Sequence, residues 1–179
     1  MGEAHSESRF EAHRSGALTP FVGRELELKI LFHRWGQAED GEGQVVLISG
    51  EPGIGKSRIA ETIHERLPAE NHFRLLYQCS PHHTNSALHP VIEHLNFAAG
   101  LSADEPDEAK LDKLEALIAQ ATDGVNAIAP LFADLLSIRH DERYPALNLT
   151  PQAQKERPLQ ALVALLVGLA AHKPVLFVF

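Results

Sequence analysis

The chain opens its ordered part with alternating helix-like and strand-like patterns of apolar residues. A helix is predicted from Arg24, because four apolar side chains recur at the i, i+3, i+4, i+7 spacing of one helical face: Leu28, Leu31, Phe32 and Trp35. The run 44–49 (QVVLIS) is β-branched and nearly all apolar, which predicts a strand buried on both faces. Residues 56–67 predict a second helix, ended by a proline, and residues 73–79 predict a second strand. This order predicts a βαβ unit with a right-handed crossover.

The next part of the chain has helical spacing throughout. Apolar positions predict three helices, around residues 91–95, 111–118 and 125–135. The acidic run 104–108 suits the N-terminus of the second of them. Residues 139–149 predict a loop.

A last helix and a last apolar run follow. Thr150 and Pro151 are typical of an N-cap and a first helical position. Pro158 is expected to kink or restart this helix, which then continues to Ala171. The run 175–179 (VLFVF) predicts a third buried strand. The chain is therefore expected to be an α/β protein with three strands and a helical insert between the second and the third.

A glycine-rich segment joins the first predicted strand to the second predicted helix. Its residues, G50-E-P-G-I-G-K-S57, match the P-loop pattern G-x-x-x-x-G-K-[ST] in the strand–loop–helix context that the pattern requires. The glycines Gly50, Gly53 and Gly55 permit the positive φ angles that turn several backbone N–H groups toward one ligand. The segment predicts a site for a nucleoside triphosphate with Mg²⁺.

Individual roles follow from the chemistry of the loop residues. Lys56 is predicted to place its ammonium on the β- and γ-phosphate oxygens, and Ser57 to bind Mg²⁺ through its hydroxyl. Glu51 is not interpreted as a catalytic base, because a side chain at such a variable loop position usually faces solvent. The remaining residues of the predicted nucleotide site are Pro52, Ile54 and Arg58.

The P-loop gives meaning to the element F-V-G-R-E at 21–25, which precedes it. Together the two elements resemble the AAA-like and STAND signalling ATPases, and more closely the ATPase module that follows a class III adenylate/guanylate cyclase domain in bacterial multidomain regulators. The resemblance covers about residues 16–179 and includes these stretches: LTPFVGRE, QVVLISGEPGIGKSR, YQCSPHHTNSALHPVIEHL, RYPALNLTPQAQKER and KPVLFVF.

The resemblance implies a P-loop NTPase fold of three α/β/α layers around a parallel sheet. It implies that Val22 and Gly23 line the adenine pocket, with Arg24 nearby, and that the nucleotide is ATP. A base-specificity element of the N-K-x-D type for guanine is not seen in the sequence. An alternative is that 21–25 merely leads into a helix. Flanking cyclase and helical-repeat domains are implied as partners in a complete protein.

The resemblance also implies parts that the sequence lacks. In the family the third strand ends in an acidic Walker B pair, and a later strand separates the first strand from the third. Here the apolar run ends at Phe179. We therefore expect residues 18–179 to be the N-terminal part of an ATPase domain, marginal in stability, with weak ATP binding and near-background hydrolysis; whether it is an enzyme stays open.

Composition narrows the remaining possibilities. The net charge of -8 argues against a large nucleic-acid surface, and no apolar run is long enough for a bilayer, which needs about 20 residues. A lone Cys79 and no visible signal peptide indicate a cytoplasmic protein. Residues 1–17 are polar and are expected to be a flexible tail or linker.

Three alternatives remain open. A zinc site is conceivable where one cysteine and four histidines gather in the sequence, although their spacing matches no common zinc scheme: Cys79, His82, His83, His89 and His94. The chain could also be a non-hydrolysing scaffold or interaction segment. A small-molecule phosphotransferase is a further alternative, weakened by the wide spacing of Arg139, Arg143 and Arg157, because such kinases usually carry an arginine-rich lid.

Overall fold

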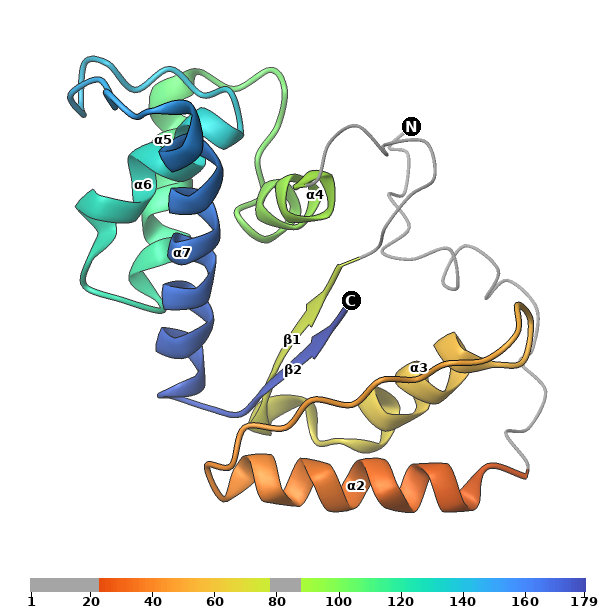
Figure 1. Cartoon of the computed structure of the whole chain (residues 1–179). Coiled ribbons are helices and arrows are strands. Elements are labelled where there is room, and N and C mark those ends of the chain that lie inside the picture. The colour runs from red at the N-terminus through yellow and green to blue at the C-terminus, as the bar shows by residue number, and fades with distance from the viewer. Residues whose placement is uncertain (1–22, 78–87) are drawn as a thin grey trace. The chain divides into compact units, whose positions relative to one another are not determined.

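The computed structural model describes residues 23–77 and 88–179, and these fall into two compact units that divide between His72 and Phe73 (Figure 1). The first predicted helix is confirmed as α2 (Glu25–Glu39), which buries Leu28 and Trp35. Its first turn carries Glu25 and Glu27, which suit the positive end of the helix dipole. Residue Val22 lies outside the described residues.

The second helix of the first unit carries the end of the glycine-rich loop. The prediction is confirmed by α3 (Lys56–Arg66), which buries Ile59 and Ile63. A single turn of 3-10 helix, η1 (Ala69–Asn71), follows. Beyond it the buried His72 ring lies edge-on to the rings of Trp35 and His64, at centroid distances of 5.5 and 5.7 Å. These ring contacts join α2, α3 and the chain after η1 into one small core.

The strand predicted at 44–49 is wrong for this structure. The segment has no strand conformation, and Val45 and Leu47 are 98% and 88% exposed. An apolar, β-branched run becomes a strand only where a neighbour completes its hydrogen-bond ladder. No strand of the described chain pairs with this segment. The predicted βαβ unit therefore lacks its first strand.

The second unit contains a pair of parallel strands. They are β1 (Phe73–Leu76) and β2 (Val175–Val178), which pair from Phe73 with Val175 to Leu76 with Val178. The parallel orientation agrees with the parallel sheet that was expected, whereas the pairing of these two strands with each other was not predicted. Tyr77 extends the ladder by donating its backbone N–H to the carbonyl of Val178 at 2.8 Å. One detail differs from prediction: β2 is only half-buried, because its outer edge is unpaired among the described residues. The end of the second predicted strand, residues 78–79, lies outside the described residues.

The helical insert between the two strands is also confirmed. It consists of α4 (His89–Ala98), α5 (Asp107–Ala119), α6 (Val125–Leu135) and α7 (Pro151–Ala170) (Figure 1). Thr150 caps α7 as predicted, since its hydroxyl accepts a hydrogen bond from the backbone N–H of Ala153. The helix runs unbroken through Pro158, so the expected restart is wrong. Pro158 is buried, and packing of its ring offsets the one backbone hydrogen bond that proline removes.

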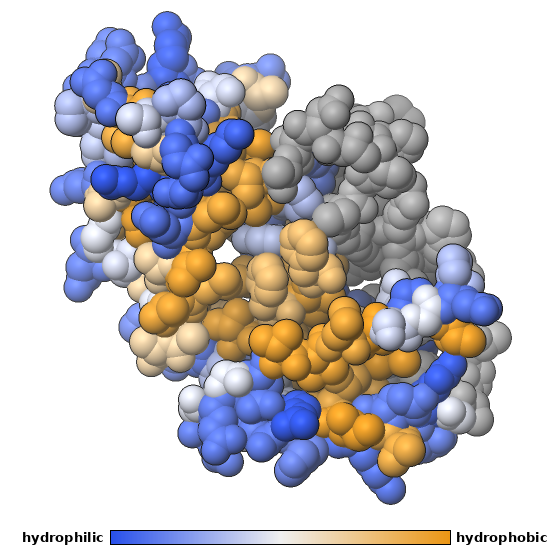
Figure 2. Space-filling view, in the orientation of Figure 1, coloured by the Kyte–Doolittle hydropathy of each residue, from blue (hydrophilic) through white to orange (hydrophobic). Residues whose placement is uncertain are grey.

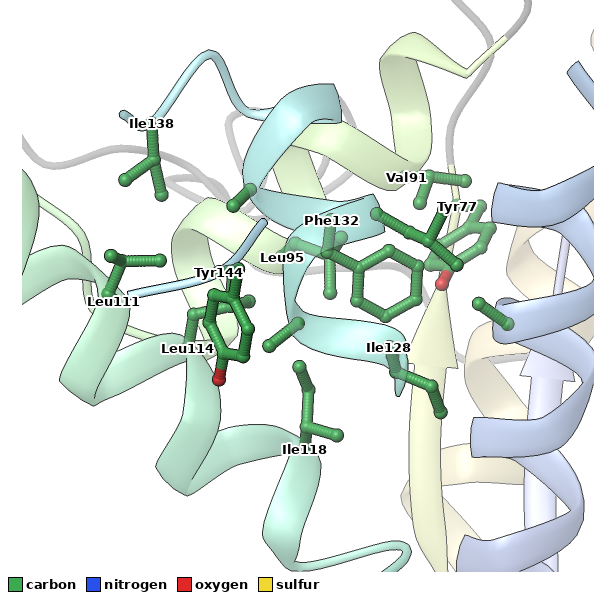
Figure 3. Close-up of a cluster of buried hydrophobic side chains, with 14 residues drawn as sticks. Tyr77, Val91, Leu95, Leu111, Leu114, Ile118, Ile128, Phe132, Ile138 and Tyr144 are labelled. Atoms are coloured by element: carbon green, nitrogen blue, oxygen red, sulfur yellow. The ribbon is translucent and has the colours of Figure 1, made fainter. Parts of the chain in front are cut away.

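The core of the second unit lies among these helices and β1. Phe132, Leu114 and Ile118 are the largest fully buried side chains. Figure 3 shows Phe132 of α6 at the centre, among Ile128, Val91 and Leu95 of α4, and Tyr77, which follows β1. One contact is especially close: a Cβ on Gly168 of α7 would lie 1.9 Å from the carbonyl oxygen of Ala121, so only glycine fits there.

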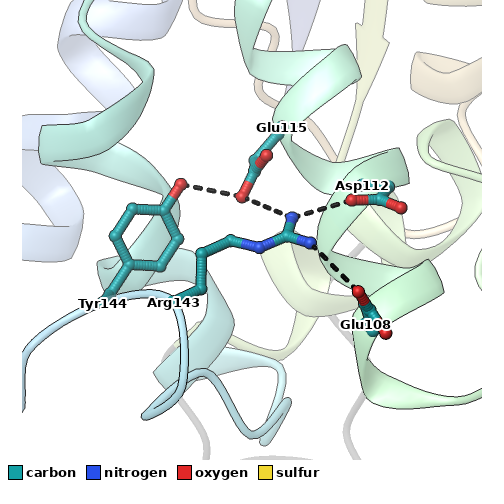
Figure 4. Close-up of polar contacts among 5 residues, drawn as sticks. All are labelled: Glu108, Asp112, Glu115, Arg143 and Tyr144. Atoms are coloured by element: carbon teal, nitrogen blue, oxygen red, sulfur yellow. Dashed lines mark hydrogen bonds and ion pairs between the residues drawn. The ribbon is translucent and has the colours of Figure 1, made fainter.

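The predicted loop 139–149 is confirmed, and it is tied to α5 by charge. The guanidinium nitrogens of Arg143 lie 2.7, 3.0 and 3.9 Å from the carboxylate oxygens of Asp112, Glu115 and Glu108 (Figure 4). The hydroxyl of Tyr144 donates to the same Glu115 carboxylate at 2.7 Å. Burial and this hydrogen bond raise the pKa of Tyr144 to about 12.

Apolar side chains also reach the surface, as the orange areas of Figure 2 show. Besides Val45 and Leu47, they include a stripe on α7 formed by Leu159, Val163 and Val167. The helices that the structure describes include none with the length and apolar character needed to cross a membrane.

Candidate functional site

The glycine-rich loop has a backbone that most residues cannot adopt. Gly53 and Gly55 have φ angles of 83° and 99°, in the left-handed region that side chains disfavour. Between them Ile54 closes a turn by donating its N–H to the carbonyl of Glu51 at 3.3 Å. The loop is exposed along Gly50–Ile54, so a ligand has access to it. Gly53 and Gly55 thus have the positive φ angles that the sequence predicts for these positions.

Helix α3 presents an open N-terminus to this loop. Gly55 is its N-cap, and no side chain caps the helix. The backbone N–H groups of the first helical turn are therefore left without an intrahelical acceptor, at the positive end of the helix dipole. Such an end is suited to binding phosphate.

Lys56 lies within the loop that it is predicted to serve. Its ammonium donates hydrogen bonds to the carbonyls of Gly50 and Glu51, both at 3.0 Å. The side chain therefore turns back over the loop, where its positive charge is close to any anion bound by the loop amides. Ser57, at the second helical position, is exposed, and its hydroxyl bonds to none of the described residues. It is free to bind a cation.

The other predicted loop residues contribute less chemistry. Glu51 and Pro52 are exposed, and Ile54 is 51% exposed. Arg58 extends along α3, with one guanidinium nitrogen 4.0 Å from the carboxylate of Glu65.

The turn at Gly23–Glu25 approaches the loop through a single side chain. The guanidinium of Arg24 pairs with Glu27 at 2.7 Å and also donates to the carbonyl of Ile54 at 3.4 Å. The Arg24 hydrogen bond lowers the pKa of Glu27, and backbone N–H groups, including that of Gly23, lower the pKa of Glu25. The structure thus brings Arg24 to the rim of the loop.

The structure describes two of the five residues of the conceivable zinc site. The imidazole of His89 lies 3.6 Å from the carboxylate of Glu93, and the ring of His94 lies tilted against that of Tyr77, with centroids 5.1 Å apart. Burial lowers the pKa of His94. The described residues contain no group of three or more possible metal ligands. The other three candidates, Cys79, His82 and His83, lie outside these residues.

Sequence reasoning missed some of the best-held side chains. The ion pairs of Arg143 and the hydrogen bond of Tyr144 join a loop to a helix that lies far away in sequence. Periodicity carries no signal for such contacts, because they depend on tertiary packing. The one available signal was that Arg143 and Tyr144 are neighbouring polar residues in a predicted loop.

Comparison with known proteins places this geometry in a family. The family described as the AAA ATPase domain matches residues 20–179. An uncharacterized protein of Rhizobium meliloti (strain 1021) is 31% identical over 159 residues, which cover 87% of this chain and 15% of that protein. The chain thus spans only a small part of this relative. No solved structure matches the chain significantly. Because the matched region takes in the glycine-rich loop and all of the described residues, the chain belongs to the AAA ATPase domain family.

Proposed function

We propose that the chain binds ATP together with Mg²⁺ at the P-loop Gly50–Ser57. The observation that carries the proposal is the combination of left-handed loop glycines, an uncapped helix N-terminus and a lysine folded over the same loop. Each of these features favours a polyphosphate, and all three belong to one loop and the first turn of the helix that follows it.

The residues fit magnesium and nucleotide in distinct ways. The amides of the loop and of the first turn of α3 would hold the β- and γ-phosphates, and Lys56 would exchange its two carbonyl partners for phosphate oxygens. The exposed hydroxyl of Ser57 would bind Mg²⁺, which prefers oxygen ligands and bridges the phosphates when bound. Glu51, Pro52, Ile54 and Arg58 would frame the loop without acting on the phosphates.

The direct test uses a fluorescent ATP analogue with Mg²⁺, displaced by unlabelled ATP. We expect saturable binding, weakened at least about tenfold in Lys56→Ala. The matched control is Lys29→Ala, since Lys29 is an exposed lysine on α2 and is not part of the glycine-rich loop. Equal binding by Lys56→Ala and the wild type would contradict the assignment of the site.

We propose further that the base lies toward Val22, Gly23 and Arg24. The family resemblance of this element supports the assignment, and so does the contact between Arg24 and the loop carbonyl of Ile54. A residue that contacts the base contributes to binding of the nucleoside part of ATP and not to binding of its phosphates. Arg24→Ala should therefore weaken competition by ATP and leave competition by inorganic tripolyphosphate unchanged. An equal loss for both competitors would place Arg24 at the phosphates.

The broader role is proposed as that of a switch module in a signal-transduction protein. Its support is the resemblance to ATPase modules that follow class III cyclase domains. In such a module the nucleotide state changes the arrangement of neighbouring domains. The coding sequence on either side of this region provides a simple test. The proposal predicts a cyclase domain upstream and a pair of carboxylates directly after Phe179, and an intact gene with neither would contradict it.

The structure gives little support to a phosphotransferase. The guanidinium of Arg139 bonds to Asp107 at 2.9 Å, and that of Arg143 is engaged by the carboxylates of α5. These two arginines therefore hold the helical insert together, and neither is placed as a lid over an acceptor.

A further inference from the structure

A cavity of about 300 Å³ lies in the helical insert, where α4 and α6 end and α5 begins. Its volume is at the lower end of the range that small-molecule sites occupy. Apolar side chains of Leu101, Leu136 and Ile138 form part of the wall, and the hydroxyl-bearing Ser102 and Ser137 stand at exposed positions on it. The cavity thus combines an apolar lining with polar groups at its mouth.

Lys110 of α5 is the one charged residue in the wall. Its side chain is only 18% exposed, and its ammonium reaches the carbonyl of Ala103 at 3.3 Å. The nearest carboxylate in an ion pair with Lys110 is that of Asp107, at 4.0 Å, and the carboxylate of Glu105 also acts on it electrostatically. The carboxylate of Asp107 is already bonded to Arg139 at 2.9 Å. The carboxylate of Glu105 is likewise bonded to another cation, Lys113. A positive charge that is largely withdrawn from water, and that shares both of its carboxylates with other cations, favours an added anion.

Ser137 has a backbone conformation that serine disfavours. With φ at 56°, it is the one non-glycine residue of the described chain with a positive φ. It follows α6, where Ile138 donates its N–H to the carbonyl of Ala133 at 2.8 Å and Ser137 donates to that of Asp134 at 3.1 Å. These two bonds form a Schellman ending, whose left-handed position is usually glycine.

Helix α4 ends at the same cavity with the same motif. There the backbone N–H of Leu101 donates to the carbonyl of Asn96 at 2.9 Å. The residue in the left-handed conformation is Gly100, with φ at 60°. Two equivalent helix ends thus carry glycine in one case and serine in the other. Glycine would remove the steric cost at residue 137 and leave the ending intact. Strain of this kind is often kept where a side chain has a use, and the Ser137 side chain lines the cavity.

The wall is also held in place before any ligand arrives. The ammonium of Lys113 donates to the carbonyl of Gly100 at 3.0 Å and pairs with Glu105 at 2.5 Å. Glu105 in turn accepts a hydrogen bond from the backbone N–H of Ser102 at 3.4 Å. Lys113, which is not part of the wall, therefore fixes the segment between α4 and α5, and Lys110 is not needed for that role. Such preorganisation lowers the entropic cost of binding.

We propose that this cavity binds a small organic acid. The carboxylate of the ligand pairs with Lys110, its hydroxyl or oxo group bonds to Ser137 and Ser102, and its carbon skeleton contacts Leu101 and Ile138. This site is separate in residues and in chemistry from the P-loop, and the inference does not depend on nucleotide binding.

The test is a titration of the ¹⁵N-labelled full chain, followed by amide chemical shifts. The probes are pyruvate, malate and 2-oxoglutarate, with glycerol as a neutral control. We expect at least one acid to shift the amides of Ser102, Ser137 and Ile138 saturably, with a dissociation constant of about 1 mM or below. Glycerol should leave them unchanged.

Two variants separate binding from folding. Lys110→Met keeps the approximate length of the side chain without its charge and should weaken the affinity for the acid at least about tenfold. The exposed control Lys155→Met should leave this affinity unchanged. Ser137→Gly should raise the midpoint of thermal unfolding by about 3 °C and also weaken binding. Gln replaces Met at residue 110 if the first variant fails to fold.

Three results would overturn the proposal. One is the absence of saturable shifts with every acid up to about 10 mM. Another is unchanged binding by the folded Lys110 variant. The last is a Ser137→Gly protein that is more stable and binds the acid as well as the wild type, since the serine would then have no role in the cavity.

Discussion

Single residues of the P-loop act through backbone geometry as much as through side-chain chemistry. Gly55 ends the loop and caps α3 with a left-handed φ of 99°, and a Cβ there would meet no atom within 4 Å. Space is therefore available, and the backbone alone excludes other residues. Lys56 depends on this conformation, because it is the first residue of α3 and the backbone of Gly55 sets where the helix begins.

Gly55→Ala should therefore act by strain. We expect a cost of about 1–2 kcal/mol to the native loop conformation, and a loss of about tenfold in nucleotide affinity. Gly43→Ala is the matched control, because Gly43 is also in a loop, also has an open Cβ position and lacks a positive φ. Urea unfolding and ATP-analogue titration of both variants measure the difference. Equal behaviour of the two would show that the left-handed position is unimportant.

The left-handed conformation of Gly53 and Gly55 could be predicted from sequence because its signal is local, whereas the nucleotide-binding role of the loop stays a prediction. Glycines, a lysine and a hydroxyl at fixed spacing are sufficient to predict the loop. Lys110 and Ser137 could not be predicted in this way. The low exposure of Lys110 depends on the packing of three helix ends. Ser137 has a left-handed conformation, but nothing in the sequence distinguishes it from other serines.

Elements of the helical insert are held to one another by polar contacts at their edges. Tyr144 is 8% exposed, and its hydroxyl donates to Glu115 of α5 (Figure 4). Its pKa of about 12 in the folded chain lies above the value of about 10 expected when it is unfolded. The fold therefore favours the neutral phenol.

This shift predicts a pH dependence of stability. The contribution of Tyr144 is fully present below about pH 10 and is lost as pH rises toward about 12, because the unfolded chain releases the proton first. Tyr144→Phe should lower the free energy of unfolding by about 1 kcal/mol at pH 8 and should flatten its fall in alkali. Urea unfolding between these pH values measures both effects. An unchanged alkaline slope in the variant would assign the dependence elsewhere, for instance to Tyr77, whose pKa burial also raises.

The segment 44–49 gives the sharpest difference between pattern and structure. Its apolar run predicts a buried strand, whereas Val45 and Leu47 are almost wholly exposed. Helices form from hydrogen bonds within their own sequence, so α2, α3 and α5 follow their periodicity. A strand needs a partner from elsewhere in the chain, which local pattern does not supply.

Charged substitutions distinguish the two states of this segment. If it is exposed, Val45→Lys and Leu47→Lys each change the free energy of unfolding by at most about 0.5 kcal/mol. In a buried strand the same changes would cost several times more, since an unpaired charge would be desolvated. Leu75→Lys in β1 provides the buried comparison, because Leu75 is 9% exposed. We expect only the Leu75 variant to unfold.

At the scale of the whole molecule, the sequence was most informative about organisation. The insertion of four helices between the two strands was predicted, and the parallel orientation of β1 and β2 in the described chain agrees with the parallel sheet that was expected. The family match over residues 20–179 agrees with the family resemblance in its broad form. How the two units are arranged is a property of long-range contacts, on which sequence periodicity is silent.

The exposed apolar surface has a consequence for the whole chain in solution. Val45 and Leu47 in the first unit, and the α7 stripe of Leu159, Val163 and Val167 in the second, remain open to water. Unpaired backbone and exposed apolar side chains both promote association. Binding measurements therefore need a concentration at which sedimentation shows the chain to be monomeric.

The central claim is that the loop Gly50–Ser57 of the folded chain binds Mg-ATP through Lys56. Isothermal titration calorimetry of the monomeric chain with Mg-ATP tests it most directly. We expect saturable heat at one site per chain, with the affinity weakened at least about tenfold in Lys56→Ala and retained in Lys29→Ala. A folded wild-type chain that takes up no Mg-ATP, or a Lys56→Ala chain that binds it equally well, would contradict the account.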